Sequence, residues 1–346
     1  MRQMMFLMFV ALLVFPSDTA VAEHPGGFPA VRADRDATDD DRRALQQQIK
    51  ALQQALATAQ SQIASLQRNG VLALAPYVTV VPGEINGLGG PHIIFSGANV
   101  HIQSGSGATN ENGTLTGLGN LVVGYNEVTD EFGAGPKGPG LEQARSGSHN
   151  VIVGPAHIYS SFGGMVGGDN NTISGVHASV TAGLGNIASG ARSSISAGAG
   201  NKASGDLSSV SAGQFNTASG NSSSVSAGQN NTASGSGSSV SGGVNHTARG
   251  GGSSVSGGAS NTANGGFSSV SGGIEGQASG EFASVSGGDN NTATGLSASV
   301  SGGADNQASG QFANVSGGRD NTASALASSV SGGQLNHADA NFQHLP

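Results

Sequence analysis

The second half of the chain has a 15-residue repeat, and this repeat constrains the fold more than any other feature. A second apolar column follows the first by eight residues, starting at Ile173 and continuing as Ala from Ala188 to Ala338. Polar residues flank both columns, which is the period-2 pattern of strands with one buried face. Each unit therefore predicts two short strands. The first column, which we count without any insertion, is Met165, Val180, Ile195, Val210, Val225, Val240, Val255, Val270, Val285, Val300, Val315 and Val330.

Glycine and asparagine recur at further fixed phases. One Gly column begins at Gly168 and a second at Gly175, and we interpret both as turns that need a positive φ. An Asn column begins at Asn171 and is interrupted only by His246 and Gly276. Stacked Asn side chains hydrogen-bond from layer to layer in cross-β structures. Two strands, two turns and a constant period predict a parallel β-solenoid, so the fold class is mainly β.

The composition indicates that such a solenoid would associate with other chains. Of the 346 residues only 10% are charged and 4% are aromatic, and the chain contains no Cys and no Trp. In a stack of coils, a charge placed in one column would face its own copy in the next coil. One Val and one or two Ala per coil bury little apolar surface, so we expect solenoids of separate chains to associate side by side.

A predicted coiled-coil helix at residues 38–69 supplies a route to that association. Thr38 is the expected N-cap, Asp39 to Asp41 lie where the helix dipole favours negative charge, and Gly70 follows the end. Apolar residues alternate four and three apart, which forms an a/d seam. The alternative is that the helix folds back on its own β domain, and the seam does not fix the number of helices. The seam residues are Leu45, Ile49, Leu52, Leu56, Ala59, Ile63 and Leu66.

The first 22 residues have the pattern of a secretory signal peptide. Arg2 precedes an apolar run from Met4 to Phe15, and a small-residue site ends at Ala22. We expect cleavage there, a secreted or cell-surface location, and no transmembrane segment in the mature chain, because a bilayer takes about 20 apolar residues. Residues 23–37 contain Pro and Gly and are predicted to form a flexible lead-in.

Residues 70–150 carry bulkier apolar runs than the repeat. Asn120–Gly124 matches Asn150–Gly154 at twice the period of the repeat, which makes loop 126–148 an insertion. We expect the whole segment to form wider, irregular coils that cap the solenoid and connect it to the helix. The regular repeats are predicted at residues 151–346.

Units such as "SSVSAGQNNTASG" and "SSVSGGASNTANG" resemble the head repeats of trimeric autotransporter adhesins of the YadA type. The resemblance covers roughly residues 150–340, where the Val, Gly and Asn-x-Ala-x-Gly phases agree together. It implies a left-handed β-roll, a homotrimer, and a bacterial surface protein that binds host or environmental surfaces. The sequence departs from the family in three ways: the coiled coil precedes the head, we expect no C-terminal membrane anchor, and the period is slightly longer.

No catalytic constellation is evident, so we predict a protein that is not an enzyme and uses no cofactor. The nine His residues lack metal-ligand spacing, and no Gly-x-Ser-x-Gly lies between a strand and a helix. The Asp of "GGDNN" does not recur at its phase, which disfavours calcium. A net charge of −8 with scattered basic residues disfavours nucleic acid.

We therefore predict an exported structural or adhesin-like surface protein whose partners are itself and a surface ligand. The phase three residues before each apolar residue varies most, and aromatic residues there form a predicted stripe for subunit packing or for a ligand. That stripe comprises Phe162, Phe267, Phe282 and Phe312.

Two alternative functions remain open. An ice- or surface-binding solenoid would use a flat hydroxyl face, but Ser lacks the methyl group of Thr, and Lys202, Arg249, Gln277 and Gln307 interrupt the Thr face. A polysaccharide-active solenoid enzyme would need paired carboxylates in phase along the coils, which the sequence lacks.

Overall fold

The structure is a computed structural model that describes residues 29–68, 70–127 and 145–346. The chain divides into two compact units, Met1–Val100 and His101–Pro346. The predicted signal peptide and most of the predicted loop 126–148 lie outside the described residues. Within the described ranges, no helix is both long enough and apolar enough to cross a membrane.

The first unit contains one long helix, α1 (Pro29–Gln67), followed by a short 3-10 helix, η1 (Gly70–Leu74). The helix begins at Pro29, so the predicted start at Thr38 and the flexible lead-in are wrong from Pro29 onward. Proline suits the first helical position because its φ is already helical and its missing N–H has no intrahelical partner there. At the other end, Arg68 Nε donates to the carbonyl of Ala64 at 3.0 Å and satisfies a terminal acceptor.

Two strands of the first unit, β1 (Val78–Val81) and β2 (His92–Phe95), pair antiparallel. Ile85 and Leu88 form a tight bridge in the segment between them, so the chain reverses direction within a few residues. A parallel coil requires the chain to travel around and return in the same direction. The prediction that residues 70–150 form capping coils is therefore wrong for residues 70–100.

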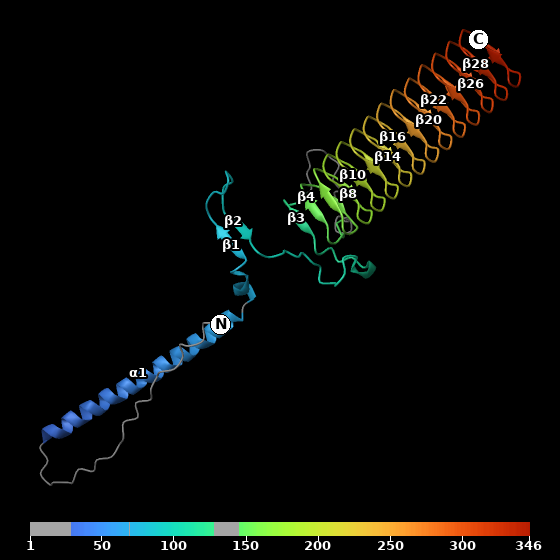
Figure 1. The fold of residues 1–346 in the computed structure, drawn as a ribbon. Helices are drawn as coiled ribbons and strands as arrows, with labels where there is room; N and C mark the ends of the chain where they lie inside the picture. The colour runs from blue at the N-terminus through green and yellow to red at the C-terminus, as the bar shows by residue number, and fades with distance from the viewer. Residues whose placement is uncertain (1–28, 69, 128–144) are drawn as a thin grey trace. The chain divides into compact units, whose positions relative to one another are not determined.

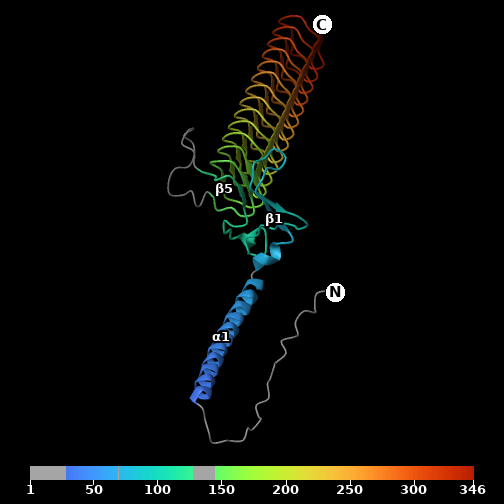
Figure 2. The same cartoon turned by 90° about the vertical axis from the view of Figure 1, so that its left-hand side faces the viewer.

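The second unit is a parallel β-solenoid of about 13 coils, which confirms the predicted solenoid architecture (Figure 1). Each complete coil contributes one strand to each of two sheets. In the described residues the larger sheet has 15 strands and the smaller has 13, because the first and last strands of the larger sheet have no counterpart in the smaller one. A line of single parallel bridges runs beside them from Asp169↔Leu184 to Arg319↔Gln334. Figure 2 shows the stack from its side, with β5 (Ile158–Tyr159), an end strand of the smaller sheet, at the opposite end from the C-terminus.

The larger sheet comprises β3 (Leu121–Val123), β4 (Val151–Val153), β6 (Met165–Gly167), β8 (Ser179–Val180), β10 (Ser194–Ile195), β12 (Ser209–Val210), β14 (Ser224–Val225), β16 (Ser239–Val240), β18 (Ser254–Val255), β20 (Ser269–Val270), β22 (Ser284–Val285), β24 (Ser299–Val300), β26 (Asn314–Val315), β28 (Ser329–Val330) and β30 (His344–Leu345). The smaller sheet continues from β5 with β7 (Thr172–Ile173), β9 (Ile187–Ala188), β11 (Lys202–Ala203), β13 (Thr217–Ala218), β15 (Thr232–Ala233), β17 (Thr247–Ala248), β19 (Thr262–Ala263), β21 (Gln277–Ala278), β23 (Thr292–Ala293), β25 (Gln307–Ala308), β27 (Thr322–Ala323) and β29 (His337–Ala338).

The register confirms the predicted period from Val180 onward but not before it. Val166, not Met165, pairs with Val180, so this step is one residue shorter than the period. Val166 is 0% exposed whereas Met165 is 41% exposed. The prediction that Met165 starts the buried column is therefore wrong, because the first coils are shorter than the later ones. The predicted match at twice the period is confirmed, since Val122 pairs with Ile152.

The interior is a narrow stack of small residues. The Val and Ala columns are at most 1% exposed from Val180 and Ala188 onward, as predicted. Two further columns are also buried: the Asn column and a Ser or Ala column two residues before each Val. The Ser or Ala column could not be assigned to the interior from the sequence, because a Ser-Ser-Val-Ser pattern does not distinguish which Ser faces inward. Its members are Ala178, Ser193, Ser208, Ser223, Ser238, Ser253, Ser268, Ala283, Ala298, Ala313 and Ser328.

The Asn column forms a ladder that joins each coil to the next through the backbone. Asn231 is representative: its Nδ2 donates to the carbonyls of Ala227 at 3.1 Å and Gly243 at 3.0 Å. Its Oδ1 accepts the N–H of His246, in the next coil, at 2.9 Å. Each ladder Asn from Asn171 to Asn321 thus makes three hydrogen bonds to main-chain groups. The stacked amides of cross-β structures instead bond to one another.

The two Gly columns require glycine for different physical reasons. Gly183 has a φ of 98°, and its column continues with positive φ values, as predicted. The second column, which includes Gly250, has no positive φ. A Cβ at Gly250 would overlap the carbonyl oxygen of Gly265 in the next coil. The predicted positive φ is therefore wrong for this column, where Gly permits the close approach of two backbones.

Candidate binding surfaces and a cavity

One face of the solenoid carries no charged residue. We define the serine face as the outward residues on either side of the buried residue in each strand of the larger sheet from β8 to β28. It contains only Ser, Thr and Asn, and the residues after each buried Val or Ile are exposed. Its members are Ser179, Ser194, Ser209, Ser224, Ser239, Ser254, Ser269, Ser284, Ser299, Asn314 and Ser329 before the buried residue, and Thr181, Ser196, Ser211, Ser226, Ser241, Ser256, Ser271, Ser286, Ser301, Ser316 and Ser331 after it.

The hydroxyls of the serine face are free to bond outward over most of its length. In the described chain they form side-chain hydrogen bonds only near Asn314, which bonds Ser299 and Ser316, and near His344, which contacts Ser329 and Ser331. Neighbouring rungs lie about 4.8 Å apart in the direction of pairing. The face is therefore a regular lattice of unpaired donors and acceptors on small side chains.

The charges of the repeat occupy the other surfaces. The outward positions of the smaller sheet carry Lys202 and Arg249 among Thr and Ser, and Gln277 and Gln307 interrupt the Thr column. An Arg319 guanidinium lies 4.0 Å from the carboxylates of both Asp305 and Asp320 at one corner. Exposed charge on a sheet discourages unwanted association. Because charged residues occur on the smaller sheet and at this corner but not on the serine face, the serine face differs chemically from the other surfaces of the repeat.

The predicted aromatic stripe is only partly continuous. The Phe267 and Phe282 rings stack in adjacent coils with centroids 5.5 Å apart, and both side chains are exposed. Phe312 lies two coils beyond Phe282, with Ser297 between them at the same phase. Phe162 lies several coils nearer the N-terminus and, because the step from Val166 to Val180 is one residue short, it is displaced by one position from the stripe. Its ring packs against His177, with the ring centroids 5.2 Å apart. The exposed Phe342 extends the stripe to the last coil.

The seam of the helix is exposed in the single chain. Leu45, Ile49, Leu52, Leu56, Ile63 and Leu66 are each between 49% and 69% exposed. From residue 39 onward the other side chains of α1 are polar or Ala, so these six side chains form its one stripe of large apolar residues.

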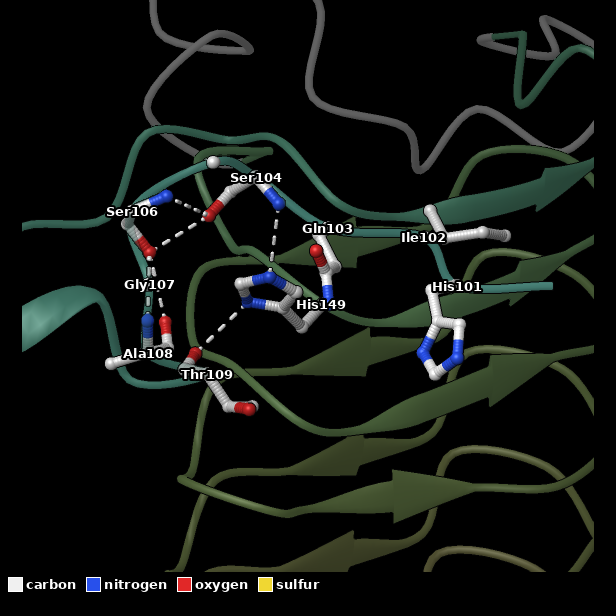
Figure 3. Close-up of a pocket in the computed structure, with 10 residues that line it drawn as sticks. His101, Ile102, Gln103, Ser104, Ser106, Gly107, Ala108, Thr109 and His149 are labelled. Atoms are coloured by element: carbon white, nitrogen blue, oxygen red, sulfur yellow. Dashed lines mark hydrogen bonds between the residues drawn. The ribbon is translucent and has the colours of Figure 1, made fainter. Parts of the chain in front are cut away.

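A surface cavity of about 410 Å³ lies at the start of the second unit (Figure 3). Its wall is the loop from His101 to Thr109, and His149 projects into that loop. The Ser104 N–H donates to His149 Nε2 at 3.2 Å, so Nδ1 carries the proton and donates to the Thr109 carbonyl at 3.0 Å. The Ser104 hydroxyl bonds Ser106 Oγ at 2.9 Å, so no serine hydroxyl is paired with the imidazole.

The buried carboxylate of Glu111 connects the segment around Thr116 to Ser148 through hydrogen bonds. Glu111, in the 3-10 helix η2 (Glu111–Gly113), accepts hydrogen bonds from the Thr116 N–H, from Thr116 Oγ1 at 2.8 Å and from Ser148 Oγ at 2.9 Å. Burial raises the pKa of Glu111, but hydrogen bonds from Ser104, Thr116 and Ser148 outweigh it and lower the pKa to about 2. Glu111 is thus an ionised structural anchor.

The described residues contain no candidate metal-ion site. No group of three or more His, Cys, Asp or Glu in these ranges is arranged to hold a metal ion. From the sequence, a flat hydroxyl face was considered only for the ice- or surface-binding alternative, and neither its freedom from charge nor the Glu111 anchor was identified. The serine face could have been found in the sequence, because no charged residue occurs at its positions in any repeat. The Glu111 anchor could not, because it joins two segments that are far apart in the chain and share no periodic pattern.

Comparison with protein-family models and with curated proteins finds no match to this chain.

Proposed function

We propose that the protein is an exported, adhesin-like structural protein whose solenoid presents the serine face for attachment to a surface. The observation that carries this proposal is the serine face itself: a charge-free lattice of hydroxyls over the strands from β8 to β28. The interiors of protein interfaces are depleted of charged residues, whereas freely exposed sheet surfaces carry them.

In the same proposal, three chains assemble through a coiled coil formed by α1, and their solenoids are left-handed β-rolls. The exposed seam supports assembly, because an isolated helix with one apolar stripe gains most of its stability by burying that stripe. The number three follows from the resemblance of the repeats to trimeric adhesin heads. Assembly multiplies weak contacts, since each chain held near a surface raises the effective concentration of the others.

Attachment is tested with two double variants that add the same charge to the same coils. S226R/S241R places two Arg on the serine face, and S219R/S234R places them on the smaller sheet, at the phase where Arg249 occurs naturally. Beads carrying residues 23–346 are presented to silica, polystyrene, dextran-coated and collagen-coated surfaces. We expect attachment to at least one surface, loss of it in S226R/S241R, and retention in S219R/S234R, with all proteins showing the same circular dichroism.

Attachment to no surface, or equal attachment of the two variants, would contradict the proposal. Assembly is tested separately by the native mass of residues 23–346. We expect the mass of three chains for the natural sequence and of one chain for Leu52→Asp, which places a charge in the seam. A natural chain that stays monomeric would refute the trimer without bearing on the serine face.

A further inference from the structure

A histidine replaces one asparagine in the ladder at the middle of the solenoid. His246 is 0% exposed and accepts the N–H of Asn261 on Nδ1 at 3.1 Å, as an Asn Oδ1 would. Its backbone N–H donates to Asn231 Oδ1 at 2.9 Å. Nε2 is buried and has no hydrogen-bond partner, whereas an Asn Nδ2 at this phase has two. The ring therefore fits the ladder only as a neutral imidazole with a hydrogen-free Nδ1.

No acidic group is available to compensate a charge at this position. Between Asp206 and Glu275 the sequence contains no Asp or Glu. The coils that pack above and below His246 contain one other charged residue, Arg249, which is exposed and has the same sign as an imidazolium. A protonated His246 would thus place an unpaired positive charge in the interior, and a new N–H would face the N–H of Asn261.

His157, the other buried histidine of the ladder, differs in this respect. It also accepts an N–H on Nδ1, from Asn171 at 3.2 Å, but its Nε2 bonds the Val153 carbonyl at 3.0 Å. Asp169 lies close enough to favour its charged form. The two histidines therefore occupy the same kind of position, but only His246 lacks both a partner for Nε2 and a nearby carboxylate.

We propose that His246 is an acid-sensitive joint, and that its protonation opens the solenoid at residues 231–261 while the coils beyond it stay closed. The inference concerns the described coils alone and does not depend on the proposed attachment function. An opened joint would expose unpaired strand edges in the middle of the stack, where strands of another chain can pair.

The direction of the pH dependence follows from burial. Burial lowers the pKa of His246 below its ordinary value near 6.5, and contacts with the backbone of Gly258 and Asn261 offset this only in part. The closed joint is fully stable above that ordinary value and loses stability as the pH falls below it, because the open form takes up the proton more readily than the closed form. Between pH 7.5 and pH 5.0 the equilibrium constant for opening should rise several-fold, with an upper bound of about 30-fold that applies when the closed form takes up no proton.

Hydrogen–deuterium exchange of the full chain at pH 7.5 and 5.0 tests the proposal, with rates corrected for the intrinsic effect of pH. We expect protection of residues 231–261 to fall several-fold at pH 5.0, and by at most about 30-fold. Residues 277–330 serve as an internal reference, because they contain three ladder asparagines, Asn291, Asn306 and Asn321, and no histidine. Protection of residues 277–330 should change by less than about twofold, which is smaller than the change expected for residues 231–261.

Two variants complete the experiment. H246N restores the ladder residue and should abolish the loss of protection at residues 231–261, whereas H157N should leave that loss in place. The proposal is overturned if protection of residues 231–261 in the natural chain is unchanged at pH 5.0, if it falls equally in residues 277–330, or if H246N shows the same fall. The first two outcomes are read from the natural chain and do not depend on the folding of a variant.

Discussion

Replacing Gly276 with Asn should strengthen the one rung of the ladder that has no side chain. The neighbouring rung shows what is missing: Asn261 Nδ2 donates to Gly257 O at 2.8 Å and to Gly273 O at 3.0 Å, and its Oδ1 accepts the Gly276 N–H at 2.8 Å. At Gly276 no side-chain oxygen is present to accept the buried N–H of Asn291. An Asn there would bond the carbonyls of Gly272 and Gly288 and this N–H.

The magnitude follows from those three hydrogen bonds. Each contributes about 1 kcal/mol net, and removing a glycine from the unfolded chain adds about 0.7 kcal/mol. Against this, a Cβ at Gly276 would lie 3.0 Å from Asn261 Oδ1 and 3.2 to 3.3 Å from the Val270 and Val285 methyl groups. Such crowding costs about 1 to 2 kcal/mol. We expect the free energy of local opening to rise by about 2 kcal/mol, which lowers the equilibrium constant for opening by about 30-fold.

Hydrogen exchange measures this gain where it occurs, because a stack of repeats need not unfold as one unit. The amides of residues 277–291 should exchange about 30-fold more slowly in G276N than in the natural chain. Gly272→Asn is the matched control, since a Cβ at Gly272 meets no atom within 4 Å and the side chain would lie outside the ladder. Exchange in G276N that is no slower than in G272N would refute the reasoning.

Three further predictions concern a buried hydroxyl, the close approach of two coils, and the carboxylate anchor. Ser223 Oγ is buried without a partner, so S223A should raise the free energy of local unfolding by about 1 kcal/mol, measured by hydrogen exchange, and a loss would contradict this. Gly250→Ala should destabilise its coil by about 3 kcal/mol because the new Cβ overlaps the Gly265 carbonyl, whereas Gly257→Ala, with open space around it, should be neutral or slightly stabilising; equal thermal shifts would count against this view. The Glu111 anchor is fully stabilising above its ordinary pKa near 4.5 and weakens as the pH falls toward about 2, so exchange of residues 104–117 should quicken over that range in the natural chain but not in E111Q.

Much of the solenoid could be predicted because each coil lies against near-copies of itself. A residue at a fixed phase stacks on its counterpart one period away, so a column in the sequence is also a column in space. Val255 and Ala263 could be placed inside for this reason, and the Asn ladder followed from the same register. The serine face was equally present in the sequence, but its significance depends on knowing which phases face outward together.

The helix could be predicted from its spacing, but its beginning could not. The seam from Leu45 to Leu66 identified the helical segment, whereas the start at Pro29 lies outside the seam. A polar segment with helix-favouring residues shows no apolar period, so pattern alone does not mark where such a helix begins.

The sequence by itself determined the period, the inward Val and Ala columns and the ladder, because these depend only on residues that repeat in register. Tertiary structure alone decided the rest. Because the step from Val166 to Val180 is one residue short, Met165 lies at the surface. The Gly250 column requires glycine because the backbones of successive coils approach closely there. The bond from Ser148 to Glu111 joins segments with no shared pattern, and such contacts follow from the path of the chain in space, which local periodicity does not encode.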